Sequence, residues 1–489
     1  MILDQLLLVL SPYLLLVCLI GTALGILWGA MPGLSTTMAM ALLIGLSTGM
    51  TQNVAITFML GVFTGSVFGG AISAVLINIP GTPDSVPTMI EGYPLAQRGE
   101  GGLVLGTAIA ASFLGNWIGI LLMIGFIPLI LKIALSFRSL EMCLLALWGI
   151  AISGTMAAGK RPLKGWMSGW IGLLVSFVGV DAIHGVPRYA FGFNALDDGI
   201  SYIPVLIGLF GLAEVLRVLP KTTSTSIPAN VGRVIPPMRA LWKYSRAAVR
   251  SGLIGTIVGA IPGAGANVAA FLSYDIGRRR ASPAERAKWG KGSYEAIVCA
   301  EVANNANIGG SLLPTLTLGI PGSAAAAAFL AALELKNVVV GPMIQIEHPG
   351  LIYYIYWALI IANFLMYGAA IMLVKPCIKL FSLPQTLLMP IILLVCTLGA
   401  YAVSLSYLDV YIMLVAGLVG YLLRRFGFPL APMVLAVILG PVADENFRRA
   451  LVVLHDKSLS AILTDHPIGI LLFIIVIYTF YDGIFRRRT

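Results

Sequence analysis

Four Pro-Gly pairs interrupt apolar stretches of this 489-residue sequence, and small hydroxyl or amide residues follow them. Pro removes a backbone donor and Gly permits left-handed conformations, so each pair predicts the end of a helix. At lipid depth the freed backbone groups are costly unless they line a cavity or bind a ligand. Helices that restart after such breaks direct their positive N-terminal dipoles into the cavity, which suits a small anion.

The predicted substrate site therefore collects residues from all four breaks. The candidate substrate-binding residues are Gly33, Ser35, Thr36, Thr37, Gly81, Thr82, Gly263, Ala264, Asn267, Gly322 and Ser323, and the helix breaks are Pro32, Pro80, Pro262 and Pro321. Hydroxyl and amide donors among them suit carboxylate oxygens. Pro and Gly also occur in membrane helices as plain kinks, but four breaks with polar residues behind each favour a binding site.

A second polar cluster, Asn304, Asn305 and Asn307 after Glu301, lies in an otherwise apolar stretch. Polar groups at this depth either serve function or hold helices together. Amide oxygens of Asn304 and Asn305, together with Asn78 ahead of the second break, are candidates for coupling a transported Na⁺, and helix association is the open alternative. The five cysteines and four histidines show no metal-ligand spacing, so no cofactor and no metal other than Na⁺ is expected.

The breaks belong to an internal repeat. Residues 24–39, LGILWGAMPGLSTTMA, match residues 254–269, IGTIVGAIPGAGANVA, at an offset of 230. Residues 78–83, NIPGTP, match residues 319–324, GIPGSA, at an offset of 241. Each half thus contains a hairpin break and then a broken helix, which predicts inverted-topology repeats, a common plan of secondary transporters. The expected divisions are a first repeat at 1–219, a basic cytoplasmic linker at 220–250, and a second repeat with additional C-terminal helices at 251–489.

The composition places these motifs in a membrane protein. Charged residues make up 11% of the chain and hydrophobic residues 58%, whereas soluble domains carry about 25% charged residues. The mean hydropathy is +0.94. These values exclude a soluble enzyme, a disordered chain and a fibrous repeat. The net charge of +10 comes from Lys and Arg in short clusters between apolar runs, which marks cytoplasmic loops and not a nucleic-acid surface.

The apolar runs predict an all-α integral membrane protein with about 11 transmembrane helices and two re-entrant helical hairpins. The candidate spans lie at or near 53–79, 101–131, 140–158, 165–180, 200–219, 293–320, 350–374, 380–408, 408–423, 429–443 and 467–484. Segment 251–277 has basic residues on both flanks, so we expect it to enter and leave on the cytoplasmic side. Segment 5–50 lacks them, which predicts a hairpin open to the outside.

The same charges predict an external N-terminus, retained as structure and not cleaved as a signal peptide, and an internal C-terminus. Catalytic motifs are weak: residues 154–160 fit G-x-x-x-x-G-K, but Arg161 replaces the required Ser or Thr, so no ATPase and no enzyme is predicted. An ion channel or a stand-alone ion-coupled carrier would use the same broken helices and stays an alternative. Buried polar residues argue against a purely structural subunit.

The chain resembles the large membrane subunit of the tripartite tricarboxylate transporters, the TctA family, over nearly its whole length. The matching segments are GAMPGLSTTMAMALL at 29–43, NIPGTPDSVPTMIEGYPLAQRGEGG at 78–102, GAIPGAGANVAAFLSY at 259–274, EVANNANIGGSLLPTLTLGIPGS at 301–323 and GPMIQIEHPGLIY at 341–353. The resemblance implies a permease that imports small carboxylates (tri- or dicarboxylates such as citrate), driven by a Na⁺ or H⁺ gradient, with elevator-type movement of the repeat core against a scaffold.

It also implies partners and a location: a small four-helix membrane subunit, a periplasmic substrate-binding protein, and the lipid bilayer of the bacterial cytoplasmic (inner) membrane, with a homodimer formed through the scaffold. Three positions depart from the pattern, Asp84 where a small residue is expected, Glu91 in place of Asp, and Gly45 in place of Pro. An Asp beside the site would repel a carboxylate unless a cation neutralises it. The alternative role for Asp84 is a helix N-cap.

Overall fold

The fold is almost entirely helical. The structure, a computed structural model, describes residues 2–159, 161–181, 183–218, 232, 234, 242–380, 385–455 and 464–485. Within these ranges the one β element is a hairpin of β1 (Gly179–Val180) and β2 (Pro187–Arg188), paired antiparallel. Most of the predicted linker at 220–250, Lys160 and the three C-terminal arginines lie outside the described residues.

The helices follow the order of the two predicted repeats. The first half contains α1 (Ile2–Val9), α2 (Pro12–Ala30), α3 (Thr36–Ser47), α4 (Gln52–Ile77), η1 (Pro83–Ser85), α5 (Val86–Leu95), η2 (Ala96–Glu100), α6 (Gly101–Ala134), α7 (Ser139–Ala157), α8 (Pro162–Ser176), η3 (Asn194–Leu196), α9 (Tyr202–Leu206), η4 (Ile207–Leu212) and α10 (Ala213–Val218). The second half contains α12 (Ser245–Gly259), α13 (Gly265–Arg280), α14 (Pro283–Arg286), α15 (Tyr294–Leu318), α16 (Ala324–Glu334), α17 (Ile344–Glu347), α18 (Leu351–Leu380), α19 (Gln385–Ser404), α20 (Tyr407–Arg425), α21 (Ala431–Leu454) and α23 (Pro467–Phe485).

Seven helical stretches in the described chain are long and apolar enough to cross a membrane. They are Pro12–Ala30, Gln52–Ile77, Pro83–Ala134, Ser139–Ala157, Leu351–Lys379, Leu387–Ser404 and Tyr407–Arg425. The chain is therefore an all-α membrane protein, as predicted. The expected spans at 293–320 and 429–443 also form long helices, α15 and α21, which are less apolar. The eleven crossings and the two re-entrant hairpins go beyond this finding and stay predictions.

Helices are interrupted at all four Pro-Gly pairs. The break between α2 and α3 contains Gly33 at φ +88°, and the break between α12 and α13 contains Gly263 at φ +74°. α4 and α15 end on Asn78 (φ +55°) and Gly319 (φ +69°), each two positions before the proline of the next break. Left-handed residues terminate helices, and proline prevents their continuation. The local physics of Pro and Gly therefore decides where these helices end.

Glycines let the backbones of paired helices touch in both halves. α2 packs along α4, and a methyl group at Gly25 would lie 2.5 Å from the Val62 carbonyl oxygen. α12 packs along α15 in the same way, and a methyl group at Gly255 would lie 2.3 Å from the Ala303 carbonyl oxygen. Such close approach through small residues is a usual mode of helix association in membranes.

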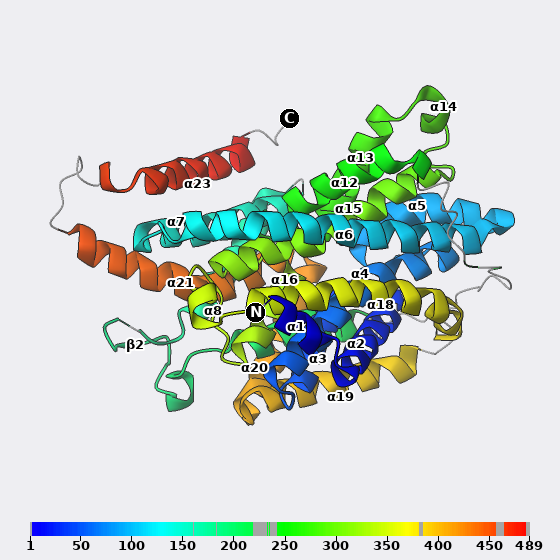
Figure 1. Cartoon of the computed structure of the whole chain (residues 1–489). Coiled ribbons are helices and arrows are strands. Elements are labelled where there is room, and N and C mark those ends of the chain that lie inside the picture. The colour runs from blue at the N-terminus through cyan, green and yellow to red at the C-terminus, as the bar shows by residue number, and fades with distance from the viewer. Residues whose placement is uncertain are drawn as a thin grey trace.

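The long helices α6 and α18 connect the halves. α6 packs along α15 and against α12, as Figure 1 shows for α6 and α15, whereas α18 packs against α2 and α4. The two long helices are joined by the Asn116 side chain, whose Nδ2 donates to Asn363 Oδ1 at 3.0 Å. Each half therefore packs against the long helix of the other half.

The remaining helices form a periphery around this core of broken helices. α21 packs on α7 and α8, and α23 packs on α7, at the end of the molecule shown on the left of Figure 1. α20 packs on α9, η4 and α10, and α19 packs on α3 and α20. The core and the periphery together enclose the site described next.

Candidate functional site

A cavity of about 310 Å³ lies where the helix breaks meet. Its polar and small lining residues include Ser35, Thr36, Thr37, Asp84, Gly263, Ala264, Asn267, Asn304, Asn307, Ser323 and Arg424. Phe63, Val67, Met156 and Phe210 add apolar surface. The structure thus brings seven of the predicted substrate-binding residues, and Asn304 from the predicted ion-coupling set, around one cavity.

The lining is paired across the two halves of the chain. At the offset of 230, residues 35–37 correspond to residues 265–267, and both segments line the cavity. At the offset of 241, Val67 corresponds to Ile308 and Asp84 to Ala325, and these four residues line it as well. The cavity therefore lies between equivalent segments of the two halves.

Helix N-termini point to this cavity because each break is followed by a new helix. Ser35 caps α3, with its Oγ accepting from the Met38 backbone N–H at 3.1 Å. Ser323 caps α16 in the same way, accepting from the Ala326 N–H at 3.1 Å. α13 also begins at the cavity, at Gly265. The partial positive charge of helix N-termini favours anions.

Several buried polar atoms of the lining have no protein partner. Considering the described residues, Thr36 Oγ1, Asp84 Oδ2 and both amide atoms of Asn304 make no hydrogen bond. Buried polar atoms in folded proteins are nearly always paired. These atoms are therefore available to a ligand that enters the cavity.

Arg424, at the C-terminal end of α20, brings a positive charge to the cavity. Its Nη1 lies 2.5 Å from Glu214 Oε2, and the buried Glu214 carboxylate also pairs with Arg217. Two guanidinium groups sharing one carboxylate leave a net positive charge, and guanidinium groups bind carboxylates well. Arg424 was not predicted from the sequence, because two arginines at the end of an apolar run are also typical of a cytoplasmic loop next to a membrane span.

Other predicted residues shape the breaks and do not line the cavity. Gly81 N–H donates to the Gly70 carbonyl at 3.3 Å, and Gly322 N–H donates to the Ser311 carbonyl at 3.4 Å. Asn305 is buried, with its Nδ2 donating to the Glu301 carbonyl at 3.0 Å. The residues absent from the cavity lining are Gly33, Gly81, Thr82, Gly322, Asn78, Asn305 and the four break prolines.

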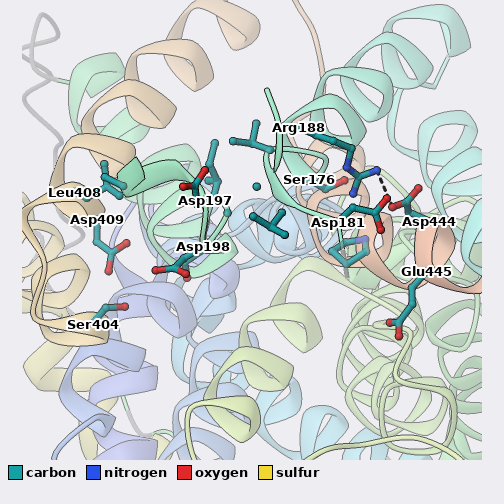
Figure 2. Close-up of a pocket in the computed structure, with 18 of the residues that line it drawn as sticks. Ser176, Asp181, Arg188, Asp197, Asp198, Ser404, Leu408, Asp409, Asp444 and Glu445 are labelled. Carbon is teal, nitrogen blue, oxygen red and sulfur yellow. Dashed lines mark ion pairs between the residues drawn. The ribbon is translucent and has the colours of Figure 1, made fainter. Parts of the chain in front are cut away.

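A second cavity, of about 700 Å³, is acidic and shares no lining residue with the first. Figure 2 shows Asp197, Asp198 and Asp409 around it, with an ion pair of 2.9 Å between Arg188 and Asp444.

The acidity of the second cavity persists to low pH at one of its lining residues, Asp181. The Ile183 backbone N–H donates to the Asp181 side chain and, with further help from His184 and Arg448, lowers the pKa of that carboxyl to about 2. Ionised carboxylates repel anions, so the first cavity is the better candidate for an anionic ligand.

Comparison with known proteins places the chain in a family. Residues 15–435 match the tripartite tricarboxylate transporter TctA family. The chain belongs to the TctA family. It is 31% identical over 463 residues to an uncharacterized 52.8 kDa protein in the TAR-I ttuC′ 3′ region of Agrobacterium vitis, which covers 94% of this chain and 91% of that protein. A second Agrobacterium vitis protein, uncharacterized and in the TAR-II ttuC′ 3′ region, is 32% identical over 216 residues, covering 44% of this chain and 87% of its own. No solved structure matches the chain.

TctA membership confirms the resemblance carried by the sequence motifs. The matched residues 15–435 include all four Pro-Gly breaks and the whole lining of the first cavity. Together with the seven apolar helical stretches, the family makes this TctA protein a multi-pass membrane component of a tripartite tricarboxylate transporter, in the role of the permease.

Proposed function

We propose that this TctA protein is the permease of a binding-protein-dependent secondary transporter that imports small carboxylates, such as citrate, across the bacterial cytoplasmic membrane. A Na⁺ or H⁺ gradient drives the import. The substrate occupies the cavity of about 310 Å³ at the helix breaks, which we name the central cavity. The observation that carries the proposal is the convergence of helix N-termini and Arg424 on this cavity.

The electrostatics of the central cavity support an anionic substrate. α3, α13 and α16 begin at its wall, so unpaired backbone N–H groups and dipole ends are near a bound carboxylate. The guanidinium of Arg424 adds a full charge, and Thr37 and Asn267 add neutral donors. A small di- or tricarboxylate has enough oxygens to use several of these groups together.

The position of the central cavity supports an elevator-type movement. One wall comes from the helix breaks of the core, and the other comes from peripheral helices, with Met156 on α7, Phe210 on η4 and Arg424 on α20. Movement of the core along the periphery would carry a bound substrate across the membrane. The matched glycine contacts of α2 with α4 and of α12 with α15 support two inverted repeats, each with one re-entrant hairpin.

The proposed assembly follows from the tripartite family. A periplasmic binding protein delivers the carboxylate, a small four-helix membrane subunit accompanies the permease, and two permeases pair through the scaffold. The N-terminus lies outside and the C-terminus inside, because the Lys and Arg clusters mark the cytoplasmic loops.

Uptake of labelled citrate and tartrate-sized dicarboxylates in proteoliposomes tests the proposal. The full chain is reconstituted with its small membrane subunit, the binding protein is added outside, and uptake is compared under an inward Na⁺ gradient, an inward H⁺ gradient and no gradient. Gradient-dependent uptake that requires the binding protein is the expected result.

Two results of the same assay would contradict the proposal. Equal flux without the binding protein would identify a stand-alone carrier or a channel. Absence of uptake for every carboxylate, with correctly inserted and folded protein, would show that the central cavity does not serve carboxylates.

A further inference from the structure

The part of the central cavity that the first half of the chain lines contains a carboxylate without a counter-charge. Asp84 is the middle residue of η1, its side chain lines the cavity, and it is only 7% exposed. Among the described residues no group completes a hydrogen bond to its Oδ2 atom, and none forms an ion pair with Asp84. An isolated carboxylate at this depth is costly unless a cation or a proton balances its charge.

Two more oxygen-bearing side chains flank this carboxylate. The Thr82 and Asn304 side chains lie within interaction range of the Asp84 carboxyl, and both are about 1% exposed. Thr82 Oγ1 and Asn304 Oδ1 have no hydrogen-bond partner in the described part of the chain. A carboxylate, a hydroxyl and an amide are therefore buried together, and each has an oxygen without a geometrically complete hydrogen bond in the described part of the chain.

The nearby buried acid Glu301 does not belong to this group. Its two carboxylate oxygens accept from the hydroxyls of Thr88, at 2.5 Å, and Ser112, at 2.9 Å. Its hydrogen bonds hold α5 and α6 to α15. Asp84 is thus the acid at the cavity whose charge still needs a partner.

The positions related by the repeat keep a hydroxyl, because Ser323 corresponds to Thr82, but they lack the carboxylate and the amide. At the offset of 241, Asp84 corresponds to Ala325 and Asn304 corresponds to Phe63. Both Ala325 and Phe63 line the same cavity. The pairing of Asp84 with Asn304 of α15 is therefore not repeated across the cavity, and the repeated architecture alone does not account for it.

We propose that Asp84, Thr82 and Asn304 form a Na⁺ site in the wall of the central cavity, and that the bound ion compensates the charge of the substrate carboxylate. Hard monovalent cations bind oxygen ligands, and Na⁺ sites of transporters commonly lie at the ends of broken helices. Thr82 and Asp84 follow the C-terminal end of α4, where the last carbonyls of a helix lack intrahelical partners. A proton would need one acceptor, whereas a carboxylate with a neighbouring hydroxyl and amide offers several oxygen ligands to a metal ion.

The charges around the cavity make such an ion useful. Arg424 and Arg217 share the Glu214 carboxylate, so these three side chains carry a net charge of one positive unit. The substrate carboxylates and Asp84 together carry more negative charge than this unit offsets. A Na⁺ held by Asp84 attracts the substrate, which in turn strengthens Na⁺ binding, because coupling between two sites is reciprocal. This inference rests on the proposed function for the identity of the coupled anion.

Binding of ²²Na⁺ to the purified full-length chain in detergent, without substrate, tests the site directly. Wild type should bind Na⁺ saturably, and Asp84→Asn should bind it about 100-fold more weakly, the scale of removing a buried charged partner. Asn304→Ala and Thr82→Ala should each weaken binding about tenfold. Asp198→Asn, which removes a carboxylate from the acidic second cavity, is the matched control and should bind like wild type.

Two outcomes overturn the inference. One is an unchanged ²²Na⁺ affinity in Asp84→Asn. The other is the absence of saturable ²²Na⁺ binding in a wild-type preparation that elutes as a single folded species. If Asp84→Asn does not fold, Asn304→Ala and Thr82→Ala carry the test. The proposed function is judged separately by uptake. Na⁺ binding through Asp84 without any carboxylate transport would refute the proposed function and support the Na⁺ site. H⁺-driven carboxylate uptake without Na⁺ binding would support the proposed function and refute the Na⁺ site.

Discussion

The two walls of the central cavity share their backbone packing but differ in their chemistry. Gly81 in the first half and Gly322 in the second half are equally tight, since a methyl group on either would lie about 2.1 or 2.2 Å from the carbonyl oxygen of Gly29 or Gly259. The side chains that follow differ: Asp84 lines the first wall where Ala325 lines the second. The repeat therefore produces the same backbone packing in both halves, whereas the Asp84 carboxylate occurs in one half only.

This difference gives the cavity two poles. The proposed cation pole has Asp84 and Asn304. The proposed anion pole has Arg424, the capped N-terminus of α16 and the beginning of α13. An ion-coupled transporter of anions needs both, because separate cation and anion contacts let each ligand strengthen the binding of the other.

The largest effect is expected from Gly81→Ala and Gly322→Ala, and it should be equal in the two halves. Each new methyl group would collide with a backbone carbonyl, which cannot move aside as the end of a flexible side chain can. Overpacking of this severity costs about 3 kcal/mol or more. Both variants should lose monodisperse protein on size-exclusion chromatography and lower the melting temperature of what remains.

Gly125→Ala is the matched control for these glycine variants. Gly125 lies inside α6, and among the described residues a new Cβ there would meet no atom within 4 Å beyond the neighbouring backbone of its own helix. Alanine also favours helix over glycine by about 1 kcal/mol, so this variant should fold normally. Normal folding of one of the two break variants would refute the equal packing of the two walls.

Ala325→Asp should abolish most carboxylate uptake by giving the anion pole the carboxylate that belongs to the other wall. Two like charges about 4 Å apart in a partly screened site repel by about 4 kcal/mol, so uptake should fall about 1,000-fold. The first turn of α16 tolerates an acidic residue, and the protein should stay folded. Initial rates of gradient-driven citrate uptake measure the effect.

Ala325→Asn separates charge from size in this experiment. It has nearly the volume of the Asp variant and no charge, so it should keep most of the uptake. Equal losses in both variants would mean that the position responds to packing, and the proposed difference in polarity between the walls would lose its support.

Arg424→Gln should raise the carboxylate concentration for half-maximal uptake about 30-fold, because a charge-assisted contact to a carboxylate is lost. Glu214 keeps its ion pair with Arg217 in this variant, which limits damage to the fold. The exposed neighbour Arg425 supplies the control Arg425→Gln. An unchanged half-saturation concentration in Arg424→Gln would remove the guanidinium from the anion pole.

Thr37→Ala and Asn267→Ala should give the smallest effects, about fivefold lower uptake each, since a neutral hydrogen bond contributes about 1 kcal/mol. The two residues are equivalent at the offset of 230 and line the cavity from opposite halves. Membrane insertion, followed by the amount of protein in the membrane fraction, should stay normal. Full uptake by both variants would exclude them from the site.

The helix breaks and the repeated motifs could be predicted from the sequence because Pro and Gly act on the local backbone. The polar residues just after the breaks, such as Ser35, Thr36 and Ser323, were therefore found as well. Asp84 stood out from the family pattern, although its burial beside Asn304 depends on how η1 packs against α15.

The cavity residues on the peripheral helices could not be predicted, because local sequence patterns do not show how distant helices pack. Met156, Phe210 and Arg424 come from helices far along the chain, and their positions depend on tertiary packing that no local pattern specifies. Asn78 shows the opposite case. It lies next to a break in sequence, but in the structure it is exposed at the end of α4 and does not line the cavity.

Protection of introduced cysteines by substrate tests most directly whether the central cavity holds the carboxylate. The five native cysteines are buried, so Thr37→Cys, Asn267→Cys and, in the acidic second cavity, Asp198→Cys report on chosen positions. A small anionic methanethiosulfonate labels each variant with and without citrate in the presence of Na⁺. Citrate should slow labelling at positions 37 and 267 and leave position 198 unchanged. Protection confined to position 198, or no protection at 37 and 267, would contradict the assignment of the central cavity as the substrate site.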